Sequence, residues 1–373
     1  MTLLLSLWLD GSILEMPEVF DIAPCEDGYR MGFLIGQRFS SLIRSRAARD
    51  VILQEQLLPF AQTPPGRELL EALSINNKQA YPRYWDEMLG MAEGSGVPFL
   101  EIKLVNFRKE LLPFVQMQGG PREAVGGEDC SDVLVVNDSL AVAAHNEDAN
   151  VALVGHTYLV RVVLPNGLSF TAYTYAGELP SCAFGFNRNG LAFTLNAVPP
   201  AETEIMAGGI GRNFISRDLL EAAGLDDALI RIRSANASVG HSYNLVDVRN
   251  RKILNVETAS GNRISVHEVG ATPFFHANMY LHLQVQQASP MKVPNESSLS
   301  RQRRAAQLSA KSKAEILSVL GDSADEKCPI YMTGPMLHTL CTVLIDLDQQ
   351  VLSIHEGNPK KGEVICAFPI VRK

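Results

Sequence analysis

The sequence changes character near residue 130. Before it, apolar residues recur at spacings of three and four, which predicts helices over residues 28–45, 66–95 (with a break at Pro82) and 99–112. Pro98 suits the first turn of the third helix, and Pro113 is expected to end it. The amino-terminal third of the chain is therefore expected to be mostly helical.

After the glycine pair at 126–127, the pattern becomes one of short hydrophobic runs joined by polar turns, which predicts β-hairpins. The predicted hairpins pair residues 132–136 with 140–144, 157–164 with 168–175, 183–186 with 191–195, and 242–248 with 252–258. Helices are expected again at about 213–236 and 298–320, before two last strands at 341–346 and 350–356. This order predicts an α+β fold with antiparallel sheets.

Several predicted strands are apolar at successive positions, as from Val133 to Val136, which indicates sheets covered on both faces. A four-layer helix–sheet–sheet–helix sandwich would cover them in this way. The 373 residues are 46% hydrophobic and 20% charged, and no linker-like run divides them. One continuous fold is therefore expected.

The net charge of −8 argues against a nucleic-acid partner, because phosphate backbones are bound by clustered basic side chains. The basic cluster of Arg301, Arg303 and Arg304 is interpreted as a solvated helix face. Residues 1–10 are apolar but lack the basic start of a secretory signal, and no run is long enough to span a membrane. These features predict a cytoplasmic protein without a membrane partner.

Six cysteines are scattered along the chain without a Cys-x-x-Cys pair: Cys25, Cys130, Cys182, Cys328, Cys341 and Cys366. Neither a zinc knuckle nor a disulfide framework is indicated, so most are expected to be buried thiols in a reducing compartment. Cys130 differs in its position at the change from helix to strand. If the bond before it were cleaved, it would gain an α-amine of pKa about 7.7–8.0 that could act as its own base.

The surroundings of Cys130 resemble a known family. Asn146-Glu147-Asp148 places an Asn-x-Asp motif 18 residues after the cysteine, and Phe275-His276-Ala277-Asn278 follows downstream. These features resemble the N-terminal nucleophile hydrolases, specifically the acyl-coenzyme A:6-aminopenicillanic acid acyltransferase family (peptidase family C45), over residues 32–359. The resemblance implies the αββα sandwich of these enzymes.

The resemblance also implies roles for individual residues. Cys130 would be the nucleophile, released by self-cleavage of the Asp129–Cys130 bond, and Asp148 would orient its new α-amine. Asn278 and Asn196 would donate hydrogen bonds to the oxyanion, and Thr342 would supply a functional hydroxyl. Residues 1–129 would be a mostly helical α chain retained beside a β chain of residues 130–373.

The implied reaction is attack of the Cys130 thiol on an amide or thioester carbonyl, followed by transfer of the acyl group to water or an amine. The expected partner is a small-molecule N-acyl amine or acyl thioester. No metal or bound cofactor is expected, although acyl-coenzyme A could be a donor substrate. The sequence leaves open whether the enzyme is a hydrolase or a transferase.

Two positions depart from the family pattern. Asp129 replaces the glycine that usually precedes the nucleophile, and Glu147 replaces an aromatic residue. These departures keep open an unprocessed, inactive binding or scaffold protein with the same fold. A papain-like Cys–His pair lacks its sequence context, so His145 and His276 are expected to support the site or the core, and no zinc-enzyme spacing occurs.

Overall fold

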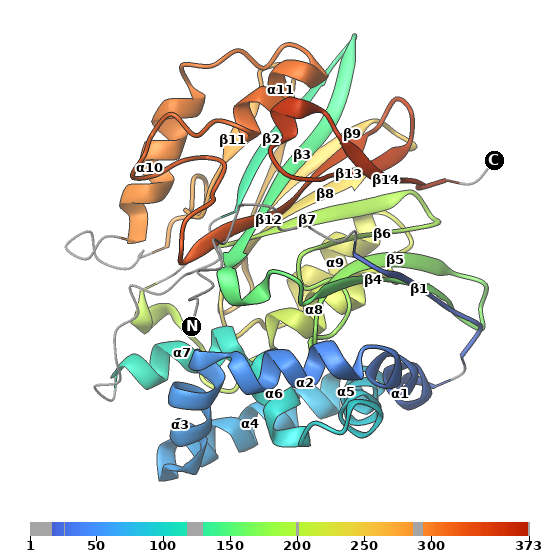
Figure 1. Ribbon diagram of the computed structural model, residues 1–373, viewed down its shortest axis with the longest axis vertical. Helices are drawn as coiled ribbons and strands as arrows, with labels where there is room; N and C mark the ends of the chain where they lie inside the picture. Colours follow the sequence, from blue (N-terminus) through green and yellow to red (C-terminus); the bar gives the residue numbers. More distant parts are fainter. Residues whose placement is uncertain (1–16, 26, 118–129, 199–200, 286–293, 372–373) are drawn as a thin grey trace, which may run out of the picture.

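The computed structural model describes residues 17–25, 27–117, 130–198, 201–285 and 294–371, which form four layers (Figure 1). A group of helices, in blue to cyan, covers one face of a first sheet. A second sheet packs on the other face of the first, and two orange helices, α10 and α11, lie beyond it. The predicted α+β class and αββα order are confirmed.

The helices of the first layer come mainly from the amino-terminal third. In chain order they are α1 (Gly28–Arg38), α2 (Ser40–Arg49), the π-helical turn η1 (Leu53–Leu57), α3 (Leu58–Gln62), α4 (Pro64–Ala80), α5 (Pro82–Ser95), α6 (Phe99–Asn106) and α7 (Arg108–Met117). α8 (Arg212–Leu219) and α9 (Leu225–Ser234) join them. The side chains of Asp27 and Thr63 accept backbone N–H bonds at the starts of α1 and α4, which fixes where these helices begin.

Eight of the described strands form the first sheet, in the order β1-β4-β5-β6-β7-β8-β9-β10. Their bounds are β1 (Val19–Ile22), β4 (Thr157–Val163), β5 (Ser169–Tyr175), β6 (Phe184–Asn187), β7 (Leu191–Ala197), β8 (His241–Asp247), β9 (Lys252–Ala259) and β10 (Arg263–Glu268). Neighbouring strands are antiparallel, except that β1 pairs with β4 in parallel.

Six further described strands form the second sheet, in the order β11-β2-β3-β12-β13-β14. Their bounds are β2 (Ser131–Asn137), β3 (Leu140–Asn150), β11 (Phe274–His276), β12 (Leu337–Asp346), β13 (Val351–His355) and β14 (Val364–Pro369). α10 (Pro294–Ala305) and α11 (Lys313–Leu320) cover its outer face. Short 3₁₀ turns complete the chain: η2 (Val151–Leu153), η3 (Glu202–Glu204) and η4 (Pro359–Lys361).

Three apolar layers hold the four structural layers together. The first packs helix residues such as Ile35 and Leu73 against Tyr158 and Phe193 of the first sheet. The second lies between the sheets, and the third lies between the second sheet and α11. Because both faces of both sheets are buried, successive strand residues are apolar, as the sequence indicated.

The structure also corrects several boundaries. Residues 28–45, 213–236 and 298–320 each form two helices rather than one, and β14 follows the two strands expected to be last. Pro113 does not end a helix but lies inside α7. Leu111 and Val115 beside it are buried in the core, and this packing offsets the one helical hydrogen bond that proline cannot make. None of the helices in the described ranges has the length and apolar character of a membrane span.

Helices α1 and α5 are in close backbone contact, and glycines make this contact possible. A Cβ atom added to Gly32 would come within 1.8 Å of the Glu87 backbone oxygen, and one added to Gly90 within 1.9 Å of the Tyr29 oxygen. Real Cβ atoms do not approach backbone oxygens so closely. The two helices therefore require glycine at these positions.

We expect Gly32→Ala to lower the free energy of unfolding by about 1–3 kcal/mol, because α1 and α5 must separate to admit the methyl group. Gly270→Ala is the matched control, since an added Cβ there meets no atom within 4 Å. Urea denaturation of both variants measures the difference. Equal stability of the two variants would contradict the close packing of α1 on α5.

Candidate active site

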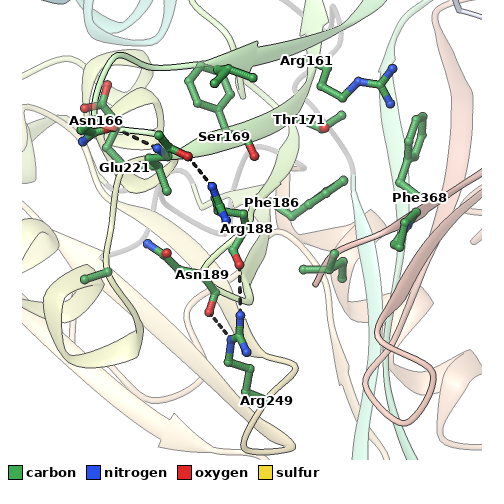
Figure 2. Close-up of a pocket in the computed structure, with 17 residues that line it drawn as sticks. Arg161, Asn166, Ser169, Thr171, Phe186, Arg188, Asn189, Glu221, Arg249 and Phe368 are labelled. Atoms are coloured by element: carbon green, nitrogen blue, oxygen red, sulfur yellow. Dashed lines mark hydrogen bonds between the residues drawn. The ribbon is translucent and has the colours of Figure 1, made fainter. Parts of the chain in front are cut away.

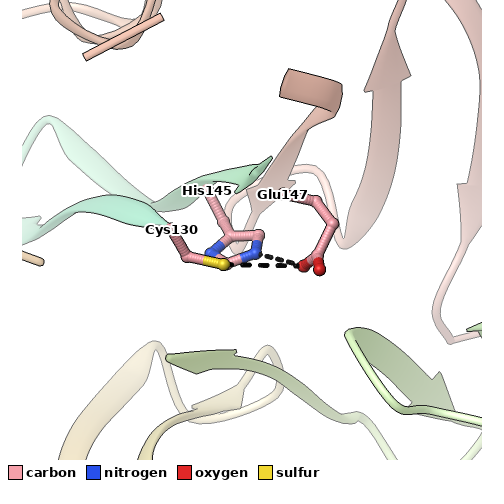
Figure 3. Close-up of side chains that lie close together, drawn as sticks. All are labelled: Cys130, His145 and Glu147. Atoms are coloured by element: carbon pink, nitrogen blue, oxygen red, sulfur yellow. Dashed lines mark hydrogen bonds and ion pairs between the residues drawn. The ribbon is translucent and has the colours of Figure 1, made fainter. Parts of the chain in front are cut away.

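Cys130 lies directly before β2, with its side chain 1% exposed. Its Sγ is 4.0 Å from Glu147 Oε2 (Figure 3). The same sulfur is 3.9 Å from the backbone oxygen of Asp148. Both contacts come from β3, which pairs with β2 in antiparallel register and continues past its start. The structure therefore brings together Cys130 and the Asn-x-Asp motif that the sequence singled out.

A buried histidine connects two carboxylates beside the thiol. His145 Nδ1 is 2.8 Å from Asp132 Oδ1, and His145 Nε2 is 2.9 Å from Glu147 Oε2. Tyr175 donates to the other oxygen of Glu147, and Thr194 donates to Asp132 Oδ1 over 3.0 Å. Since Tyr175 and Thr194 belong to β5 and β7, this hydrogen-bonded cluster joins the two sheets.

The pleat of the second sheet explains how these side chains meet. Asp132 and His145 are direct register partners on β2 and β3, and Glu147 lies two residues after His145, so all three share one face. That face looks toward the first sheet, where Thr194 and Tyr175 point back. The His-x-Glu alternation beside a candidate nucleophile was visible in the sequence, but its partners Tyr175 and Thr194 were not.

Charge and burial set the protonation of the thiol and the imidazole. Burial, and next the Glu147 carboxylate, raise the pKa of Cys130 to about 12, so the thiol is neutral near pH 7. Burial disfavours the charged form of His145, but Asp132 and the hydrogen bonds to its ring outweigh burial and raise its pKa well above the usual value. The contacts of His145 therefore favour its charged imidazolium form.

The opposite face of the second sheet holds two other candidate residues, Asp148 and Thr342. Asp148 accepts a hydrogen bond from Thr339, and Thr342 Oγ1 donates to Asn146 Oδ1 over 2.7 Å. Asn146 in turn donates to the Leu320 backbone oxygen at the end of α11 over 2.8 Å. Thr342 thus lies on the helix-covered face, away from the His145 cluster, and its functional hydroxyl stays a prediction.

The two candidate oxyanion donors are buried near the end of β7. Asn278 Nδ2 donates to the Ala197 backbone oxygen over 3.0 Å, and Asn196 Nδ2 is 3.3 Å from His276 Nδ1. Asn196 and Ala197 are consecutive residues, so both amides come to one place. Their catalytic role stays a prediction.

The burial of Arg301 shows that the cluster of Arg301, Arg303 and Arg304 is not a solvated helix face as the sequence predicted. The Arg301 side chain is fully buried, and one guanidinium nitrogen lies 2.8 Å from both the backbone oxygen of Cys130 and Ser131 Oγ. The other donates to Asn278 Oδ1 over 2.9 Å. Of the three arginines, Arg303 is exposed, and Arg304 pairs with Asp322. No sequence signal indicated this difference, because a single helical arginine has the same pattern whether it faces water or a strand end.

Cys130, His145 and Glu147 also form a group that could hold a metal ion, since one donor atom of each lies within 4.8 Å of the others. Thiolate, imidazole and carboxylate are zinc ligands, and Asp132 orients the ring as carboxylates do behind metal-bound histidines. The expectation that the protein needs no metal stays a prediction. Asp129, on the other side of the expected cleavage point, lies outside the described residues.

A surface pocket of about 780 Å³ lies elsewhere, between strands of both sheets (Figure 2). Arg161, Arg188 and Arg249 line it, but none of the predicted site residues does. These arginines make structural contacts, as Arg161 pairs with Asp21 and Arg249 donates to the Asn189 backbone oxygen. The candidate nucleophile Cys130 therefore lies outside this pocket.

Comparisons with known proteins relate this chain to enzymes that transfer or hydrolyse acyl groups. The model of the family described as acyl-coenzyme A:6-aminopenicillanic acid acyl-transferase matches residues 135–361, which include Asp148, Asn196, Asn278 and Thr342 but not Cys130. The β-alanyl-dopamine/carcinine hydrolase of Drosophila melanogaster is 27% identical over 372 residues, covering 92% of this chain and 94% of that protein.

Two solved structures are similar to this chain at low sequence identity. Penicillin V acylase from Agrobacterium tumefaciens is 16% identical with a TM-score of 0.35, covering 61% of this chain and 82% of that one. A mutant of conjugated bile acid hydrolase from Clostridium perfringens is 13% identical with a TM-score of 0.38, covering 65% of this chain and 92% of that one.

We expect Glu147→Gln to move the pH dependence of Cys130 alkylation to lower pH. The carboxylate raises the pKa of the thiol, so its removal lets the reactive thiolate form at lower pH. Alkylation with iodoacetamide, followed by peptide mass spectrometry, separates Cys130 from the other five cysteines. Glu326→Gln makes the same change at an exposed position and should leave the profile in place. A shift to higher pH in Glu147→Gln would contradict the assignment.

Proposed function

Since the chain belongs to the acyl-coenzyme A:6-aminopenicillanic acid acyl-transferase family, we propose that it cleaves or exchanges N-acyl bonds through a thioester on Cys130. The observation that carries this proposal is the position of the Cys130 thiol, at the start of β2 and against the Glu147-Asp148 segment of β3. A nucleophile at a strand start can gain an α-amine without disturbing the strand's hydrogen bonds.

Self-cleavage would generate that amine. The Cys130 sulfur attacks the carbonyl carbon of Asp129, the C–N bond to Cys130 breaks, and the thiol proton goes to the departing nitrogen. Water then hydrolyses the thioester, which leaves a carboxylate on Asp129 and a free thiol and α-amine on Cys130. Arg301, which binds the Cys130 backbone oxygen, would hold the residue in place through both steps.

Turnover would repeat this chemistry on a substrate. The α-amine takes the thiol proton as the sulfur attacks the substrate carbonyl, and passes it to the leaving amine. Asp148 would orient the α-amine. Asn278 and Asn196 would stabilise the oxyanion, because each amide nitrogen carries two donors and can serve a substrate oxygen as well as a neighbour in the protein.

The substrates that we propose are small N-acyl amines and acyl thioesters. The Drosophila relative's name points to β-alanyl-dopamine and carcinine as the first compounds to test. Whether water or an amine reaches the thioester first decides between hydrolysis and acyl transfer, and acyl-coenzyme A is a possible donor. We place the enzyme in the cytoplasm, which is consistent with six cysteines that all remain free thiols.

A second candidate function is that of an unprocessed scaffold or binding protein. The observation that favours it is the state of Cys130 in the continuous chain, where the thiol is buried and neutral. Such a thiol is a weak nucleophile until cleavage or substrate binding changes its surroundings. The two candidates therefore differ in whether the purified chain is cut.

We expect the wild-type protein to separate into two fragments, one ending at Asp129 and one starting at Cys130, and to hydrolyse N-acyl amines. Cys130→Ala should abolish both events, because no other atom can form the thioester, and Cys130→Ser should retain slow cleavage. Intact mass spectrometry and an amide hydrolysis assay measure the two outcomes. Cleavage at the same bond in Cys130→Ala would show that the step is not autocatalytic, and an uncut, inactive wild-type chain would support the scaffold.

Metal removal tests the expectation of metal-free chemistry. We expect prolonged dialysis against EDTA or 1,10-phenanthroline to leave amide hydrolysis unchanged, since the proposed steps use only the thiol, the α-amine and amide donors. The metal content of the protein before and after dialysis is measured by plasma mass spectrometry. Loss of activity that zinc restores would contradict this mechanism and would favour a metal held by Cys130, His145 and Glu147.

A further inference from the structure

We propose that Glu147 binds a positively charged group on the acyl part of the substrate, so that the enzyme prefers acyl chains with an ammonium near the carbonyl. This inference rests on the proposed function, because it concerns the substrate of the Cys130 thiol. It goes further by assigning the residue that selects the acyl group.

The first support is the set of buried carboxylates around the nucleophile. Asp132 and Glu147 each lie within hydrogen-bonding distance of the His145 ring, and Glu147 Oε2 is 4.0 Å from the Cys130 sulfur. Both carboxylates are buried. Since buried charge is costly unless it is neutralised, a carboxylate in this position favours a ligand with a positive charge.

The second support is distance. In a near-attack geometry the substrate carbonyl carbon lies about 3–3.5 Å from the sulfur. An ammonium two methylenes away lies three bonds from that carbon, which is about 3–4 Å in staggered conformations. Glu147 Oε2 is 4.0 Å from Cys130 Sγ, so such an ammonium can reach hydrogen-bonding distance, about 2.8 Å, of this carboxylate.

The third support is that Glu147 is held in place before any substrate arrives. Tyr175 donates to one of its oxygens and His145 to the other. Asp132 holds His145 in turn, and Thr194 donates to Asp132. A carboxylate offers about four lone-pair sites, so further donors can be added to these contacts. A fixed, desolvated carboxylate binds a cation at little cost in side-chain entropy.

The test compares two amides of one aromatic amine, the 3-aminopropanoyl amide and the butanoyl amide, in which a methyl group replaces the ammonium. With the processed wild-type enzyme we expect kcat/KM to be about 10–100-fold higher for the charged amide. In Glu147→Gln this ratio should fall to near one. Glu147→Asp keeps the charge and should retain part of the preference, and Glu326→Gln should retain all of it.

The ratio separates binding of the cation from a structural role, because misplacement of His145 or Cys130 would slow both amides together. Acylation of Cys130 by the corresponding thioesters, followed by intact mass, gives the same ratio if amide turnover is slow. A wild-type ratio of one or less, or a ratio unchanged in Glu147→Gln, overturns the inference and leaves the proposed function standing. Failure of both acyl groups to reach Cys130 overturns both.

Discussion

The site depends on one buried chain of hydrogen bonds, from Thr194 through Asp132, His145 and Glu147 to Tyr175. It crosses from the first sheet to the second and back, at the place where the apolar layer between the sheets meets Cys130. Charged groups in such a place are stable only when each finds a partner. This series of hydrogen bonds therefore fixes the separation of the two sheets beside the nucleophile. It also fixes the charged groups that a substrate meets there.

Arg301 extends this organisation to the fourth layer. From α10 it reaches the Cys130 backbone oxygen and Asn278, and so connects the nucleophile to a predicted oxyanion donor. The outer face of the second sheet adds a separate set of contacts, in which Thr342 and α11 hold Asn146. Thr342 and α11 thus hold β3 in place, while Arg301 holds the start of β2. A thiol held in this way loses little freedom when it attacks a carbonyl, which favours catalysis by orientation.

The helical first third and the hairpins could be predicted because they depend on local periodicity and turn residues. The helix end predicted at Pro113 was wrong because local sequence does not show tertiary packing. Proline disfavours a helix locally, but buried neighbours keep α7 intact. The parallel pairing of β1 with β4 was missed for a related reason, since pairing between distant segments leaves no local pattern. The same holds for Arg301, whose burial is decided by β2 and Asn278 rather than by its own helix.

By itself the sequence determined the helix-to-strand change before Cys130 and the spacing to Asp148. These properties follow from steric periodicity along a few consecutive residues. Only the tertiary structure decided that Asp132 would share His145 with Glu147, that Tyr175 and Thr194 would close the cluster from the other sheet, and that Arg301 would be buried. The physical reason is that hydrogen bonds and charge neutralisation act between atoms close in space, and folding brings together residues that the sequence keeps far apart.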